Sequence, residues 1–115
     1  MRWPLIVSRA TGAAGAGADG DSDQAAVDAS GTLVAFASMA SNLGAGTTGV
    51  SHVYLRNIVT GTTTLVDRAD NVAGAIANDN STFPSVTVAG GDPIVAFASE
   101  ATNHRRIGEW AIETG

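Results

Sequence analysis

One segment of about sixty residues occurs twice in this chain of 115 residues, and the repetition restricts its fold more than any other feature. Val7–Ala10 reads Val-Ser-Arg-Ala and recurs 59 residues later as Val-Asp-Arg-Ala. Four more identities keep the spacing of 59 residues: Gly15 with Gly74, Ala18 with Ala77, Ser22 with Ser81, and Val27 with Val86. The run Val34–Ser38 returns unchanged as Val95–Ser99, now 61 residues later, because a turn before it holds two extra residues. The chain therefore divides into two repeat units, 1–61 and 62–115.

The apolar residues of each unit come in short runs that are typical of strands. Leu33–Ser38 and Ile94–Ser99 are bounded by glycine-rich turns, and Val53–Asn57 alternates between apolar and polar positions. Thr62–Val66 is rich in β-branched residues, and Thr82–Val88 carries its proline near the start, where a strand tolerates one. No stretch has the 3.6-residue apolar stripe of an amphipathic helix. The sequence therefore predicts an all-β fold.

The repeat also predicts the core. Phe36 and Phe97 hold the same place in the two copies of the alanine-phenylalanine-serine run. Positions that are equivalent in a structural repeat face equivalent surroundings. We therefore expect both rings to be buried, and to be the most buried aromatic side chains of the chain.

The order of short motifs inside each unit is also distinctive. A strand that ends in the turn Asp28–Gly31 leads into Val34–Ser38, an alternating strand follows, and Thr60-Gly61 closes the unit. The second unit keeps the phenylalanine strand and ends in Thr114-Gly115. In this order the motifs resemble the repeat of TolB-like, WD-type β-propellers, and the resemblance covers nearly the whole chain. It departs from the family pattern after Asn103, where the second unit is shorter than the first.

The resemblance implies antiparallel four-stranded blades that form part of an incomplete propeller ring. One complete blade would cover about residues 25–68, from an inner strand at Ala25–Ala29 to an outer strand at Thr63–Arg68. Leu5–Arg9 would be the outer strand of a preceding blade, and Pro84–Ile112 would be three strands of a following one. Two blades do not close a ring, because propellers have about four to eight. The expected partners are further blades of a longer propeller, or other copies of the chain that associate through open strand edges.

Composition excludes several other classes of protein. The net charge is −5 and all six basic residues are arginines, so the chain lacks the basic surface of a nucleic-acid-binding protein. Arg105-Arg106 is the only adjacent basic pair. Cysteine is absent, and its absence excludes disulfides, thiolate catalysis and cysteine-bound zinc. No apolar run approaches the roughly 20 residues of a membrane-spanning helix. Trp3–Val7 is too short for the core of a signal peptide. We therefore expect neither membrane insertion nor a signal peptide in this chain.

Asp19, Asp21 and Asp23 alternate in a glycine-bearing loop and are the best candidates for a metal site. Carboxylates in such a pattern can direct their oxygens at a hard cation such as Ca²⁺. A calcium loop also uses a later glutamate, however, and the first glutamate of this sequence is Glu100. Aspartate also favours loops merely because it hydrogen-bonds to nearby backbone in turns. The favoured interpretation is a polar turn without a cofactor, and the alternative is a calcium-stabilised adhesive repeat.

The remaining residues form no recognisable catalytic set. His52 and His104 have no counterparts at the repeat spacing, and each is expected to be a half-exposed loop residue beside a strand. No Gly-x-Ser-x-Gly motif occurs, and the stretch Gly12–Gly17 lacks the Gly-Lys-Ser/Thr ending of a phosphate-binding loop. The sequence therefore predicts a protein that is not an enzyme.

The predicted function is that of a non-catalytic propeller segment, which serves as a scaffold or protein-interaction module. The alternative is a propeller appendage of a larger exported hydrolase, whose catalytic domain lies outside this chain. By resemblance, the setting of either protein would be the bacterial periplasm or the cell exterior.

Overall fold

The computed structural model of this chain describes residues 6–12, 15–46, 49–68, 76–101 and 110–114, the last range through its backbone alone. All regular structure in these residues is β-strand, so the predicted all-β fold is confirmed. Across the same residues, no helix is long and apolar enough to cross a membrane. The prediction for His104 concerns a residue outside the described ranges, and the basic pair Arg105-Arg106 lies outside them as well.

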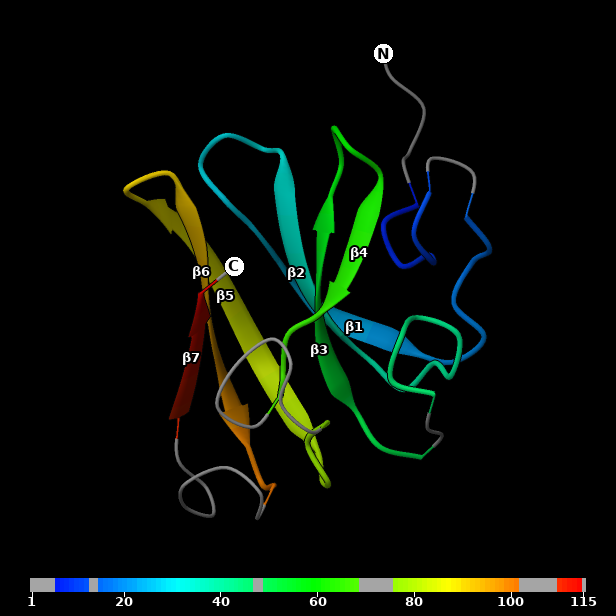
Figure 1. Cartoon of the computed structure of the whole chain (residues 1–115). Coiled ribbons are helices and arrows are strands. Elements are labelled where there is room, and N and C mark those ends of the chain that lie inside the picture. Colours follow the sequence, from blue (N-terminus) through cyan, green and yellow to red (C-terminus); the bar gives the residue numbers. More distant parts are fainter. Residues whose placement is uncertain (1–5, 13–14, 47–48, 69–75, 102–109, 115) are drawn as a thin grey trace.

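The strands form two antiparallel sheets that lie next to each other (Figure 1). In the first sheet the order is β1-β2-β3-β4, so each strand pairs with the next along the chain. These strands are β1 (Ser22–Val27), β2 (Leu33–Ser38), β3 (His52–Asn57) and β4 (Thr62–Leu65). In the second sheet the order is β5-β6-β7, with β5 (Ser81–Ala89), β6 (Asp92–Ser99) and β7 (Trp110–Thr114). The first sheet thus covers residues 22–65 rather than 25–68.

The first strand lies earlier than predicted, at Ser22–Val27 instead of Ala25–Ala29. The reason is Asp28, whose Oδ1 accepts hydrogen bonds from the backbone amides of Thr32 at 3.1 Å and Leu33 at 3.0 Å. An aspartate that bonds to the following backbone in this way stabilises a turn and ends the strand before it. The resemblance thus placed both ends of the strand too late, and the side chain of Asp28 decided where it stops.

The outer strand predicted at Leu5–Arg9 is wrong over its described residues, because Ile6–Arg9 forms no strand. Arg9 makes only an isolated bridge with Gly17. The chain instead runs along the edge of β4, where the hydroxyl of Thr11 donates to the carbonyl of Thr63 at 3.1 Å and accepts from its amide at 3.2 Å. A side chain therefore covers part of the β4 edge, in place of a fifth strand.

Arg56 holds this N-terminal segment against the first sheet. Its guanidinium is buried and donates hydrogen bonds to the carbonyls of Ala10 at 3.1 Å, Gly12 at 2.8 Å and Gly61 at 3.1 Å. Burial lowers the pKa of Arg56 from its ordinary value. These carbonyl acceptors offset part of the cost of removing the charged group from water. Residues 10–12 are therefore a fixed part of the fold.

The two sheets pack against each other through small and β-branched side chains. Ala35 and Val53 of the first sheet contact Val95 and Phe97 of the second, and all four are at most 2% exposed. Val66, which follows β4, completes this cluster. The first sheet therefore covers one face of the second.

A second cluster lies on the opposite face of the first sheet. The rings of Phe36 and Tyr54 stack there with their centroids 5.7 Å apart, and Leu43 and Leu65 pack with them. Phe36 is 3% exposed and Phe97 is 0% exposed, as the repeat predicted, but Tyr54 is also 0% exposed. Burial raises the pKa of Tyr54 to about 12, so its phenol is uncharged at neutral pH.

Residues related by the sequence repeat make the same hydrogen bonds in the two sheets. The hydroxyl of Ser22 donates to Ser38 at 2.8 Å, and that of Ser81 donates to Ser99 at 3.0 Å. In each sheet the acceptor serine also accepts a hydrogen bond from the backbone amide two residues later. Ser38 accepts from Ala40 and Ser99 accepts from Ala101, both at 3.1 Å. The bridge between Arg9 and Gly17 likewise recurs between Arg68 and Ile76.

Each sheet also has an irregularity at the same place in its first strand. Gln24 in β1 and Phe83 in β5 both have φ of 54°, a left-handed backbone that non-glycine residues seldom adopt. The pairing register shifts at both positions, as it does at a β-bulge. The two bulges are linked, because the backbone amide of Phe83 donates to Oε1 of Gln24 at 2.7 Å.

Candidate functional site

A polar cleft of about 320 Å³ lies at the end of the sheets where β1, β3 and β5 begin. Asp21, Asp23 and Glu100 contribute carboxylates to its lining. Ser51 and Asn80 join the two sheets beside it, since the amide of Ser51 donates to Oδ1 of Asn80 at 2.8 Å. Carboxylates and amide oxygens in an open cleft can accept hydrogen bonds from the backbone or from cationic side chains of a bound protein.

The three aspartates predicted from the sequence are not all at this cleft. Asp21 and Asp23 line it, whereas the carboxylate of Asp19 accepts hydrogen bonds from the amide of Ser41, at 2.6 Å, and from the Ser41 hydroxyl. These hydrogen bonds from Ser41 hold the pKa of Asp19 below its usual value. Among the described residues, no three His, Cys, Asp or Glu side chains form a group that could hold a metal ion.

The glycine of this loop has a packing explanation. A Cβ atom at Gly20 would lie 3.0 Å from backbone atoms of Ala40, which is closer than ordinary contact. The loop therefore rests against the chain that follows β2, where only glycine fits without displacement. Asp19 fastens the same loop through Ser41. Gly20 and Asp19 thus both hold this loop against the chain that follows β2.

Calcium is expected to leave the melting temperature unchanged. A cation bound only by the native state would raise it, because such a ligand stabilises the fold by mass action. The measurement is a thermal melt with and without saturating calcium, with EDTA and Asp21→Ala as controls. A rise of several degrees that EDTA reverses and Asp21→Ala abolishes would show that the aspartates bind calcium after all.

A second polar group, which the sequence did not predict, is a buried pair formed by His52 and Asp67. His52 is the first residue of β3, and Asp67 follows β4. Nδ1 of His52 lies 2.9 Å from Oδ2 of Asp67, and the two side chains are 1% and 0% exposed. The prediction that His52 is a half-exposed loop residue is therefore wrong. His52 can be buried because the carboxylate of Asp67 gives its ring a hydrogen-bonding partner inside the protein.

The fourth strand ends just before this pair. Thr63–Arg68 was predicted as the outer strand, but β4 stops at Leu65. The next residue, Val66, still donates its amide to the carbonyl of Val53 at 2.9 Å, and Asp67 follows it within hydrogen-bond distance of His52. Within the described residues, Oδ1 of Asp67 has no hydrogen-bond partner. A buried carboxylate with one bonded oxygen depends strongly on that single bond.

The sequence contained a signal for this pair. In the first unit Ser8 stands where the second unit has Asp67, inside an otherwise identical Val-x-Arg-Ala run, and His52 has no counterpart. These two departures from the repeat, Asp67 and His52, are in contact in the structure. A histidine–aspartate pair is also found in catalytic sites, but these side chains are closed off from solvent. In this structure they join the chain that follows β4 to the start of β3.

Comparison of this chain with protein-family models, with curated proteins and with solved structures finds no match.

Proposed function

We propose that this chain is a non-catalytic segment of a β-propeller and acts as a scaffold or protein-interaction module. One observation carries the proposal, namely that the first sheet covers one face of the second while repeat-related residues keep the same places in both. Stacking of one sheet on the next through repeated positions is how propeller blades and other repeat proteins bury their cores.

Strand order supports the same proposal. The first sheet has four antiparallel strands in chain order, as a blade does. Its first strand, β1, contacts β5, the first strand of the second sheet. Inner strands of neighbouring blades would meet in this way around a common axis.

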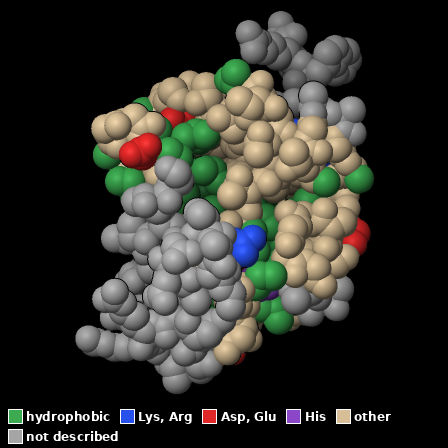
Figure 2. Space-filling model, in the orientation of Figure 1, with side chains coloured by type: hydrophobic (Ala, Val, Ile, Leu, Met, Phe, Trp, Pro, Cys, Tyr) green, Lys and Arg blue, Asp and Glu red, His purple; other side chains and the backbone are tan. Residues whose placement is uncertain are grey.

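The surface supports a role in protein binding. On the face drawn in Figure 2, hydrophobic side chains of the described residues reach the surface in several places, and charged ones are few. Four of the large exposed hydrophobic residues lie in or before the first strands of the two sheets: Ile6, Val27, Phe83 and Val88. Ile6 also lines an apolar groove with Val7 and Ala25, and exposed apolar groups gathered on one surface are typical of protein-binding sites.

Three copies of the chain, joined directly into one polypeptide, are expected to fold as a closed propeller. Such a polypeptide would contain about six blades, within the usual range of about four to eight. Each new sheet-to-sheet interface adds stability, so the melting temperature should exceed that of the single chain by about 10 °C or more. Thermal melts and small-angle scattering measure the two effects. Equal melting temperatures, together with an extended scattering profile, would contradict the proposal.

A further inference from the structure

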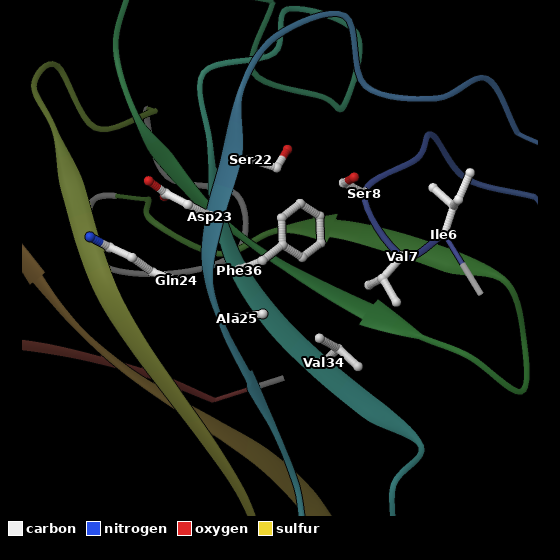
Figure 3. A pocket seen from close by; sticks show the side chains of 9 residues that line it. All are labelled: Ile6, Val7, Ser8, Ser22, Asp23, Gln24, Ala25, Val34 and Phe36. Atoms are coloured by element: carbon white, nitrogen blue, oxygen red, sulfur yellow. The ribbon is translucent and has the colours of Figure 1, made fainter. Parts of the chain in front are cut away.

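An apolar groove of about 410 Å³ lies on the face of the first sheet that is turned away from the second sheet (Figure 3). Its floor is formed by Val34 and Phe36 of β2, and one wall is formed by Ile6 and Val7. The ring of Phe36 points toward Val7 across the groove, and Ala25 of β1 lies beside it (Figure 3). Ile6 is 60% exposed, so the groove is open to solvent.

On the same face of the second sheet, the equivalent residues are covered. Val95 and Phe97 hold the places of Val34 and Phe36, and Val66 holds the place of Val7. There the first sheet covers them with Ala35 and Val53. The groove is therefore the interface between the two sheets, repeated one unit earlier and without its covering sheet.

Burial of the first strands shows the same difference. Pro84 in β5 is buried and Val86 is half-buried. Their repeat counterparts in β1 are Ala25, which is exposed, and Val27, which is 60% exposed. Apolar side chains that one sheet buries against its neighbour are thus left in water on the other.

The outer face of the second sheet is the matching surface. Ala35 and Ala37 in β2 are 0% exposed, whereas their counterparts in β6, Ala96 and Ala98, are only half-buried. Phe83 takes the place of Gln24, whose side chain reaches the bulge of the adjoining sheet. Phe83 is 62% exposed, which is unusual for an aromatic ring of this size.

We infer that the groove binds the outer face of the β5–β6 sheet of a second copy of this chain. The second copy would lie over Val34 and Phe36 as the first sheet lies over Val95 and Phe97, and it would cover Ala25 and Val27, which are exposed in the single chain. Its Phe83 would lie at the Gln24 bulge and against Ala25. The proposed contact repeats, between two copies, the sheet-to-sheet interface that already exists inside one chain. This repetition identifies a second copy as the occupant of the groove. It joins two different surfaces, so the contact is head-to-tail and leaves a free groove at one end and a free sheet at the other. The inference rests on the proposed function, since it uses the same stacking of sheets.

Sedimentation velocity from about 1 µM to about 1 mM tests the contact. The unaltered chain is expected to associate as its concentration rises. Ala25→Arg places a charge in the groove, and Phe83→Arg places one on the outer face; both positions are exposed in the single chain, so the fold is retained. Each variant is expected to raise the dissociation constant by about tenfold or more. Val59→Arg is the matched control, because Val59 is 75% exposed in the turn after β3 and should not affect association.

A mixture of the two variants is the decisive measurement. The groove is intact in Phe83→Arg and the outer face is intact in Ala25→Arg, so the mixture should form a dimer of one copy of each and nothing larger. Circular dichroism checks that each variant is folded. If Ala25→Arg does not fold, Ile6→Arg replaces it as the groove variant. A mixture that stays monomeric, or an unaltered chain that stays monomeric at every concentration, would overturn the inference. Association that neither variant weakens would also overturn it.

The triple-copy polypeptide separates this inference from the proposed function. If it folds as a closed propeller while free chains do not associate, the propeller is retained and the self-association is rejected. If free chains associate through the groove but the joined copies stay extended, the self-association is retained and the propeller is rejected.

Discussion

Replacing His52 by alanine is expected to lower the free energy of unfolding by about 3–5 kcal/mol, the usual loss when one partner of a buried pair is removed. The variant leaves the Asp67 carboxylate buried without its bond from Nδ1, and Oδ1 of Asp67 already lacks a hydrogen-bond partner among the described residues. Urea denaturation of the two proteins measures the difference.

The control replaces both partners. With His52→Leu and Asp67→Leu together, no buried polar group is left unpaired, and the loss should be much smaller than in His52→Ala. Asp67→Asn, which keeps an acceptor oxygen of nearly the same shape, should lie between the two. A loss below about 1 kcal/mol for His52→Ala would show that the pair does not fix the chain after β4.

Replacing Phe97 by alanine is expected to cost about 3–5 kcal/mol, as large-to-small substitutions of aromatic core residues do. Phe97 is 0% exposed and lies between the two sheets, where Ala35, Val53 and Val95 surround it. The two sheets cannot easily close over the cavity that Phe97→Ala would leave between them, so most of the packing energy of the ring is lost. Phe36→Ala removes the same atoms at the equivalent position. It should cost less, because Phe36 borders the open groove and water can fill the space.

Equilibrium unfolding of the two variants, at a concentration where the chain is monomeric, compares these costs. Phe83→Ala is the control, since a ring that is 62% exposed should contribute within about 0.5 kcal/mol. A larger loss for Phe36→Ala than for Phe97→Ala would mean that Phe36 is packed at least as completely as Phe97, although no sheet covers it. The assignment of the groove as an uncovered interface would then be wrong.

Much of the fold follows from local pattern and repetition. The run Leu33–Ser38 is β2 to the residue, and the strands around Val53–Asn57 and Ile94–Ser99 differ from the prediction by one or two residues at one end. Equivalence of Phe36 and Phe97 also predicted that both are buried. These features need only the two-residue period of strands and the rule that repeated residues face repeated surroundings.

Of the candidate site, the sequence located the aspartate loop but not its geometry. It placed Asp19, Asp21 and Asp23 together because they are neighbours along the chain. The structure separates them, because Ser41 draws the carboxylate of Asp19 away while Asp21 and Asp23 line the cleft. Which neighbour a side chain bonds to depends on residues that are distant in the sequence.

The sequence by itself thus determined the all-β class, the two repeat units and the phenylalanine core, since each depends on contacts along a strand or between equivalent positions. Only the tertiary structure decided the buried pair of His52 and Asp67, the course of the N-terminal segment along β4, and the uncovered groove over Phe36. The pair and the groove are departures from the repeat, where the two units differ in sequence or in having a neighbouring sheet. A repeat predicts what its copies share. The features that one copy has and the other lacks are set by long-range packing and by the cost of burying polar groups without partners.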